Sequence, residues 1–226
     1  MGTLYLVRHG QASFGADDYD QLSELGWRQA RRLGQHWRQR FGPDLRFDAV
    51  LTGTLRRQQQ TWQGIADGAG LREVPRLEWP GLDEYDSHAV ITAIHPEPLP
   101  RPDTPELYRH HFRLLRQGLL AWMRGDAAPV GMPSHADFVA GVMGALDHVR
   151  SQYAGDVLLV SSGGPISTAV AQLLRAPFET AIELNLRYRN SAVSELAFTP
   201  QRHALVSYNA LPHLAESAYR DWVTYA

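Results

Sequence analysis

The sequence predicts an α/β fold in three layers (αβα), with helices on both faces of a mostly parallel central sheet. Two observations carry this prediction. Short β-prone runs alternate along the 226 residues with segments whose apolar residues recur at helical spacing. Proline-rich stretches at residues 95–105 and 127–133 bound one long helical segment, which indicates an insertion on the core. We therefore expect a single domain over residues 1–226, with a helical lid inserted at about residues 86–135.

The first half of the chain alternates between strand and helix signals. Residues 3–7 (TLYLV) form a β-prone run, and the next helix begins after Ser23, whose hydroxyl suits an N-cap. Four apolar residues then share one helical face: Leu25, Ala30, Leu33 and Trp37. Residues 47–51 (FDAVL) predict a second buried strand, and a helix is expected from Thr54 through Ile65. The weak alternation of residues 71–77 predicts a third strand.

The second half of the chain continues the alternation. Helical periodicity predicts helices over residues 106–124 and 135–153. Residues 156–161 (DVLLVS) are the clearest strand in the chain. Pro165 suits the first turn of the helix expected over residues 166–174, because a first-turn residue needs no N–H donor. Two further β-prone runs complete the expected sheet: residues 191–198 and 204–208.

The composition excludes several chemistries. The chain has no cysteine, and all 22 of its basic residues are arginine. These absences remove disulfides, thiolate metal sites, cysteine nucleophiles, Schiff bases and the P-loop lysine. The formal net charge of −2 argues against a nucleic-acid partner. No targeting segment and no membrane-length apolar run is visible, so we expect a cytoplasmic protein with no membrane partner.

Chemically useful residues follow the expected strands at the edge where open α/β sheets bind ligands. Arg8 and His9 follow the first strand, Arg57 follows the second, and Glu84 lies in an acidic cluster after the third. Arginine forks and a glycine-rich helix N-terminus suit phosphate oxygens. A neutral imidazole can attack phosphorus, and a carboxylic acid can protonate the departing alcohol. The set predicts a small phosphorylated substrate, with no cofactor and no metal.

Several of these segments resemble, in the correct order, the signature elements of the histidine phosphatase superfamily, in its phosphoglycerate-mutase-like branch. Residues 6–10 (LVRHG) resemble the RHG signature, and residues 22–30 resemble the pattern of the first helix. Residues 55–61 (LRRQQQT) are similar to L-x-R-x-x-Q-T, which aligns Arg57 rather than Arg56 with the second arginine. Residues 160–164 (VSSGG) match V-S-H-G-G in all but the third position. The resemblance extends from about residue 4 to 170.

The resemblance implies a phosphoglycerate-mutase-like fold and a role for each matching residue. His9 would be the nucleophile that takes the phosphoryl group, while Arg8 and Arg57 would clamp its oxygens. Glu84 would protonate the leaving alcohol and later activate water. Further candidates for binding phosphate or substrate are Gln11, Ser13, Ser162 and Gly163.

Two positions depart from the family pattern. Ser162 replaces the second histidine, and the asparagine that commonly follows the RHG element falls at Gly15, although Ser13 could supply a donor nearby. Losing one transition-state donor typically costs about 10²–10³ in rate. Ser162 can still donate one neutral hydrogen bond, and the backbone of Gly163 and Gly164 could form an anion nest. We therefore expect a weakened site rather than an abolished one.

The sequence favours a metal-independent phosphatase that hydrolyses a small phosphomonoester through a phosphohistidine at His9. The competing hypothesis is a catalytically impaired phosphate-binding or regulatory module, which Ser162 favours. A phosphoglycerate mutase is less expected, because a mutase must protect its phosphoryl group from water and this clamp is weakened. The sequence leaves the substrate and the oligomeric state open, and an exposed sheet edge would allow a homodimer.

Overall fold

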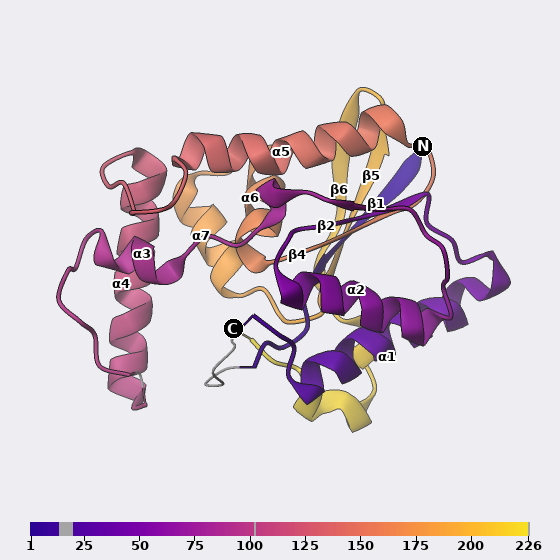
Figure 1. Cartoon of the computed structure of the whole chain (residues 1–226), viewed down its shortest axis with the longest axis horizontal. Coiled ribbons are helices and arrows are strands. Elements are labelled where there is room, and N and C mark those ends of the chain that lie inside the picture. The colour runs from indigo at the N-terminus through magenta and orange to yellow at the C-terminus, as the bar shows by residue number, and fades with distance from the viewer. Residues whose placement is uncertain (14–19, 102, 226) are drawn as a thin grey trace.

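One mixed sheet organises the chain in a computed structural model that describes residues 1–13, 20–101 and 103–225 (Figure 1). Within these residues the sheet has the strand order β3-β2-β4-β1-β5-β6. Four strands run parallel: β1 (Gly2–Arg8), β2 (Ala49–Thr52), β3 (Arg76–Glu78) and β4 (Val157–Ser161). Two strands extend the sheet by antiparallel pairing: β5 (Val193–Thr199) and β6 (Arg202–Ala210). The predicted mostly parallel sheet is confirmed.

Helices cover both faces of this sheet, which confirms the three-layer α/β prediction. One face carries α1 (Glu24–Phe41) and α2 (Arg56–Ala69). The other face carries α5 (His135–Gln152) and α6 (Gly163–Leu174) (Figure 1).

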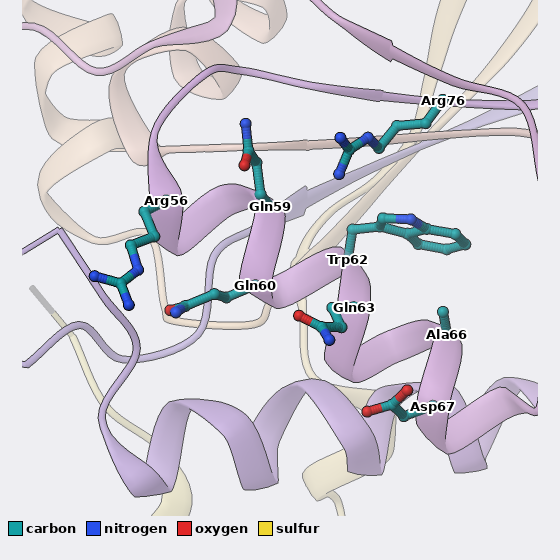
Figure 2. Close-up of a pocket in the computed structure, with 8 residues that line it drawn as sticks. All are labelled: Arg56, Gln59, Gln60, Trp62, Gln63, Ala66, Asp67 and Arg76. Atoms are coloured by element: carbon teal, nitrogen blue, oxygen red, sulfur yellow. The ribbon is translucent and has the colours of Figure 1, made fainter.

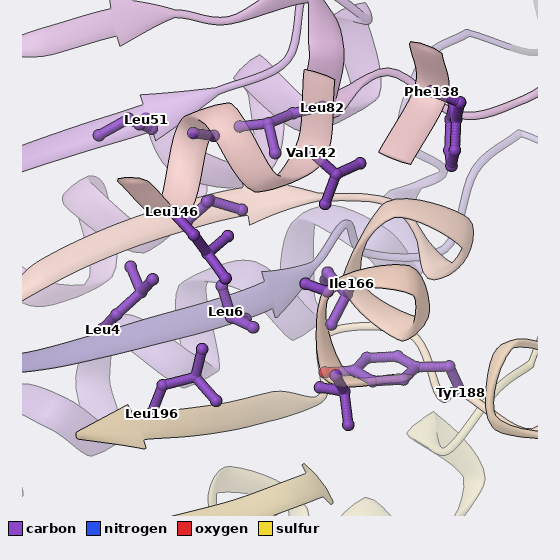
Figure 3. Packing of buried hydrophobic residues seen from close by; sticks show 14 of the residues in the cluster. Leu4, Leu6, Leu51, Leu82, Phe138, Val142, Leu146, Ile166, Tyr188 and Leu196 are labelled. Atoms are coloured by element: carbon purple, nitrogen blue, oxygen red, sulfur yellow. The ribbon is translucent and has the colours of Figure 1, made fainter. Parts of the chain in front are cut away.

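The alternation of side chains along β1 divides the core between the two layers. Leu4 and Leu6 pack with residues of α5 and α6, such as Leu146 (Figure 3). Tyr5 and Val7 point the opposite way and pack with α1 and α2. Both sets are buried, because successive side chains of a strand face opposite sides and both sides are covered by helices.

Further helices stand beside the sheet. They are α3 (Ser87–Thr92), α4 (Pro105–Arg124) and α7 (Phe178–Leu186), of which α3 and α4 extend furthest from the sheet (Figure 1). Trp122 of α4 is buried, and its ring centroid lies 6.1 Å from that of Tyr85. Short 3₁₀ segments span Gly42–Asp44, Pro80–Leu82, Pro212–Leu214 and Ser217–Trp222. No helix in the described part of the chain is long and apolar enough to span a bilayer.

Several boundaries differ from the sequence prediction. The strand expected over residues 71–77 is wrong in extent, because β3 covers only Arg76–Glu78. Leu71 instead continues the C-terminal turn of α2, where Gly70 is left-handed (φ 64°) and the Leu71 N–H bonds to Ala66 O. Helix α6 begins at Gly163, three residues earlier than the expected 166, because the two glycines form its first turn. Helices α3 and α7 were not predicted.

Candidate active site

The carboxyl ends of the parallel strands bring distant segments to one edge of the sheet. Arg8 at the end of β1 pairs with Ser161 at the end of β4, and Thr52 of β2 pairs with Val160. The His9 N–H continues this ladder by donating to the Ser161 carbonyl at 2.8 Å. His9 therefore lies beside the start of α6, as expected for a ligand site at the edge of a parallel sheet.

The His9 ring is buried, with 4% of the residue exposed, and it is held in one tautomer. Nδ1 lies 2.7 Å from the Gly10 carbonyl oxygen, which can only accept a hydrogen bond, so Nδ1 carries the proton. Nε2 is then unprotonated, and its lone pair accepts a hydrogen bond from Arg57 Nε at 3.3 Å. Burial, Arg8 and Arg57 hold the pKa of His9 well below its usual value. The ring is therefore neutral at neutral pH.

The backbone around His9 is fixed from two sides. The Gly10 N–H donates to Thr61 Oγ1 at 3.0 Å, which ties the loop to α2. The His9 carbonyl accepts from the Ser191 N–H at 3.2 Å and from Asn190 Nδ2 at 3.4 Å. These contacts hold the imidazole in place before any ligand arrives, which is the preorganisation that catalysis requires.

Two buried guanidinium groups flank the histidine. Arg57 is 7% exposed, and its Nη1 lies 2.7 Å from Asp20 Oδ1, whereas the neighbouring Arg56 is exposed. Arg8 is 5% exposed, and its Nη1 donates to the Tyr188 carbonyl. Both guanidinium charges act on the His9 ring. The structure thus places Arg57, and not the exposed Arg56, beside His9. Arg57 is the arginine that the resemblance to L-x-R-x-x-Q-T selected.

Glu84 lies against the start of α6. Its two carboxylate oxygens each lie 3.1 Å from the Gly164 nitrogen, and Oε1 also accepts from the Tyr85 N–H at 3.3 Å. Burial raises the pKa of the Glu84 carboxyl, and this outweighs the opposing effects of the Gly164 N–H, Arg57 and Arg8. A carboxyl with a raised pKa retains its proton to higher pH, as a general acid must.

The Gly164 N–H has a partner within the protein. This donor of the anion nest predicted from Gly163 and Gly164 already donates to the Glu84 carboxylate. The glycine itself is required, since a Cβ at residue 164 would overlap Glu84 Oε1.

Ser162 precedes α6 in an extended conformation and is completely buried. Its side chain makes no capping hydrogen bond to the helix. Instead, its Oγ accepts a hydrogen bond of 2.9 Å from Gln58 Nε2.

A protein-family model matches most of the chain. Residues 4–211 match the histidine phosphatase superfamily (branch 1). The chain belongs to this superfamily.

Two curated relatives are named as mutases. A 2,3-bisphosphoglycerate-dependent phosphoglycerate mutase of Mesorhizobium japonicum is 36% identical over 91 residues, which cover 37% of this chain and only 42% of that relative's length. A probable phosphoglycerate mutase GpmB of Yersinia enterocolitica is 28% identical over 204 residues, covering 86% of this chain and 84% of the relative. Among solved structures, the mycobacterial glucosyl-3-phosphoglycerate phosphatase has the same fold, with a TM-score of 0.63 at 22% identity, covering 93% of this chain and 99% of that one.

The other predicted binding residues of this histidine phosphatase superfamily member make contacts of their own. Gln11 Oε1 accepts from Ser23 Oγ at 2.8 Å, so this side chain braces the start of α1. The Ser13 N–H donates to the Gln21 carbonyl at 2.8 Å. A Cβ at Gly163 would lie 2.6 Å from Asn185 Oδ1. Gly15 lies outside the described residues.

Sequence reasoning missed several residues that hold this superfamily site together. Asp20 holds Arg57, Gln58 holds Ser162, and Asn185 Nδ2 donates to Tyr85 Oη at 2.8 Å. Each of these side chains is far in sequence from its partner, and none stands at a specified position of a family motif. The only available signal was the position of Gln58 directly after Arg57.

A surface hollow of about 430 Å³ on the outer side of α2 is separate from this site (Figure 2). Its walls are mainly glutamine and arginine side chains, together with Trp62, and they include Arg56 but none of the predicted catalytic residues.

Proposed function

We propose that this chain is a metal-independent phosphatase that hydrolyses a small phosphomonoester through a phosphohistidine at His9. The observation that carries the proposal is the state of the His9 ring. Its Nδ1–H is fixed on the Gly10 carbonyl, its unprotonated Nε2 accepts from Arg57 Nε, and its pKa is lowered by burial and by two arginines. A neutral imidazole between two guanidinium groups suits attack on a phosphate ester, whose oxygens the same arginines would bind.

In the first step, Nε2 of His9 attacks phosphorus and the bond from phosphorus to the ester oxygen breaks. Glu84 gives its proton to that oxygen, so the alcohol leaves neutral. Arg8 and Arg57 stabilise the charge on the transferring group, and Arg57 is already 3.3 Å from the nucleophilic nitrogen. The raised pKa of Glu84 keeps it protonated for this step.

In the second step, the Glu84 carboxylate takes a proton from water, and the water oxygen attacks phosphorus. The nitrogen–phosphorus bond breaks, inorganic phosphate leaves, and His9 returns to its neutral form. Glu84 regains the proton that it donated, so both residues end the cycle as they began it.

Relatives of the chain include phosphoglycerate mutases and a phosphatase, so both reactions suit the superfamily. We favour hydrolysis because Ser162 supplies at most one neutral donor where the second family histidine is expected, which weakens the grip on the phosphoryl group. The same substitution favours the alternative function, a phosphate-binding module without turnover.

The test is hydrolysis of p-nitrophenyl phosphate in the presence of EDTA by the wild type, His9→Ala and the control His88→Ala, which removes an exposed histidine. Acid-labile labelling of His9 from radioactive substrate is measured in parallel. Turnover and labelling that persist in EDTA and disappear only in His9→Ala support the proposal. Phosphate binding without turnover in the wild type would support the binding module instead.

A further inference from the structure

Gln58 and Ser162 form a buried pair next to the candidate nucleophile. Gln58 lies on α2, immediately after Arg57, and Ser162 immediately precedes α6. Both residues are 0% exposed. Gln58 Nε2 lies 2.9 Å from Ser162 Oγ and 3.0 Å from the Leu82 carbonyl oxygen. The pair therefore joins the two segments that carry Arg57 and the start of α6.

The contacts determine which atom donates. The Leu82 carbonyl can only accept, so the amide nitrogen of Gln58, and not its oxygen, faces this cluster. An amide nitrogen carries two hydrogens, of which one reaches Leu82 and the other reaches Ser162. The Ser162 oxygen is thus an acceptor in this pair. Its own hydroxyl proton must be directed elsewhere.

The opposite end of the Gln58 amide supports the same reading. Its Oε1 is buried without a hydrogen-bond partner in the described part of the chain. An unsatisfied buried carbonyl destabilises a fold, and such groups call for a specific explanation. The two hydrogen bonds that Gln58 Nε2 donates to Leu82 and Ser162 explain why this side chain is buried although its oxygen has no recorded partner.

The Ser162 hydroxyl proton has no recorded acceptor among residues 1–13, 20–101 and 103–225. The residue follows Ser161, whose carbonyl accepts the His9 N–H at 2.8 Å, so the backbone of Ser162 lies beside that of His9. A desolvated hydroxyl that is held by its oxygen presents its proton to an incoming acceptor. A phosphoryl oxygen bound at His9 is an acceptor of this kind.

We propose that Gln58 is a positioning residue that orients Ser162, so that the serine hydroxyl donates to an oxygen of the phosphoryl group transferred at His9. This inference rests on the proposed function and deepens it. The two residues act as one unit, in which the serine touches the phosphoryl group and the glutamine acts only through the serine.

The test is a double-mutant cycle with Gln58→Met, which keeps the length of the side chain but removes the donor, and Ser162→Ala. Turnover of p-nitrophenyl phosphate, affinity for inorganic phosphate and thermal midpoint are measured for each variant. We expect Ser162→Ala to lower kcat about 10²-fold. Gln58→Met should lower kcat about 5- to 10-fold with little change in KM, and should have no further effect once Ser162 is alanine.

Two further variants separate orientation from folding. Gln58→Glu keeps the shape of the side chain but reverses its polarity, because a carboxylate accepts the serine proton. It should therefore lower kcat more than Gln58→Met does. Gln59→Met is the matched control, because Gln59 bonds to Thr54 and Glu78 on the outer side of α2, and it should leave kcat unchanged.

The two proposals fail in different ways. Additive losses in the double variant, or a Gln58→Met enzyme as active as the wild type, would overturn the pairing while leaving the proposed function intact. A wild type without His9-dependent turnover would overturn the proposed function. In that case the phosphate titration still tests the pairing. The pairing is supported if Gln58→Met weakens phosphate binding in the wild type but has no effect when Ser162 is alanine. Equal phosphate binding in all variants refutes it.

Discussion

Asp20 and Arg57 form an ion pair that also organises the start of a helix. Asp20 Oδ1 lies 2.7 Å from Arg57 Nη1, and Oδ2 accepts the Arg56 N–H at 2.9 Å. One carboxylate therefore satisfies the first turn of α2 and directs Arg57 toward His9. The N-cap residue of α2 itself, Leu55, has no side chain that could do this.

Asp20→Ala should weaken both the helix and the site. Loss of a capping acceptor costs about 1 kcal/mol of folding free energy. Loss of the ion pair frees Arg57 to leave the His9 nitrogen, so we expect kcat/KM to fall about 10-fold. Urea unfolding and p-nitrophenyl phosphate kinetics measure the two effects. Asp20→Asn retains an acceptor oxygen and should preserve most of the stability, whereas unchanged kinetics in Asp20→Ala would contradict the role assigned to the pair.

The pH profile of kcat/KM should be bell-shaped for an alkyl phosphate, whose leaving group needs a proton. Protonating His9 removes the nucleophile, and since its pKa is lowered, the acidic limb should lie below pH 6.5. Deprotonating Glu84 removes the acid, and since its pKa is raised, the alkaline limb should lie above pH 4.5. Glu84→Gln should lower the rate and abolish the alkaline limb. An alkaline limb that survives in this variant would show that another group supplies the proton.

Gly164→Ala should act like a partial loss of Glu84. A Cβ at this position would overlap Glu84 Oε1 and lie 2.7 Å from the Tyr85 ring, so the carboxyl must move. We expect a loss of about 10²-fold for the alkyl phosphate, the lower end of a general-acid contribution. Gly144→Ala in α5 is the control, because the nearest atom to its new Cβ is 3.4 Å away on Trp79. If Gly164→Ala and Gly144→Ala are equally active, the contact between Gly164 and Glu84 does not position the general acid.

Ser162→His should be destabilising on its own. Ser162 is completely buried and Gln58 Nε2 is 2.9 Å from its oxygen, so an imidazole has no free volume there. Overpacking of a buried site typically costs about 1–3 kcal/mol. Shortening the neighbour in Gln58→Ala/Ser162→His should restore part of the thermal midpoint and raise the turnover above that of Ser162→His. Equal stability of the single variant and the wild type would mean that the pocket already accommodates a histidine.

Local sequence signals predicted correctly those helices whose apolar periodicity and capping residues indicate the same boundary. Ser23 caps α1 as expected, accepting from the Gly26 N–H, and α5 begins at His135 as predicted. Residues 71–77 misled the prediction because Leu71 and Val74 pack against the α1–α2 side of the core from a loop. The alternation of apolar and polar residues here arises because one side of the segment is buried. A loop that packs against the core can show this pattern as well as a strand can.

The sequence alone determined the α/β class and the edge where the candidate site residues gather, because the carboxyl ends of parallel strands necessarily meet at one edge of the sheet. The resemblance of residues 55–61 to L-x-R-x-x-Q-T also selected Arg57 over Arg56. Only the tertiary structure decided how these groups are held. The pairs Asp20–Arg57, Gln58–Ser162 and Glu84–Gly164 link segments that are distant in the chain. Such contacts depend on the packing of α2 and α6 against the sheet, which no local pattern of residues encodes.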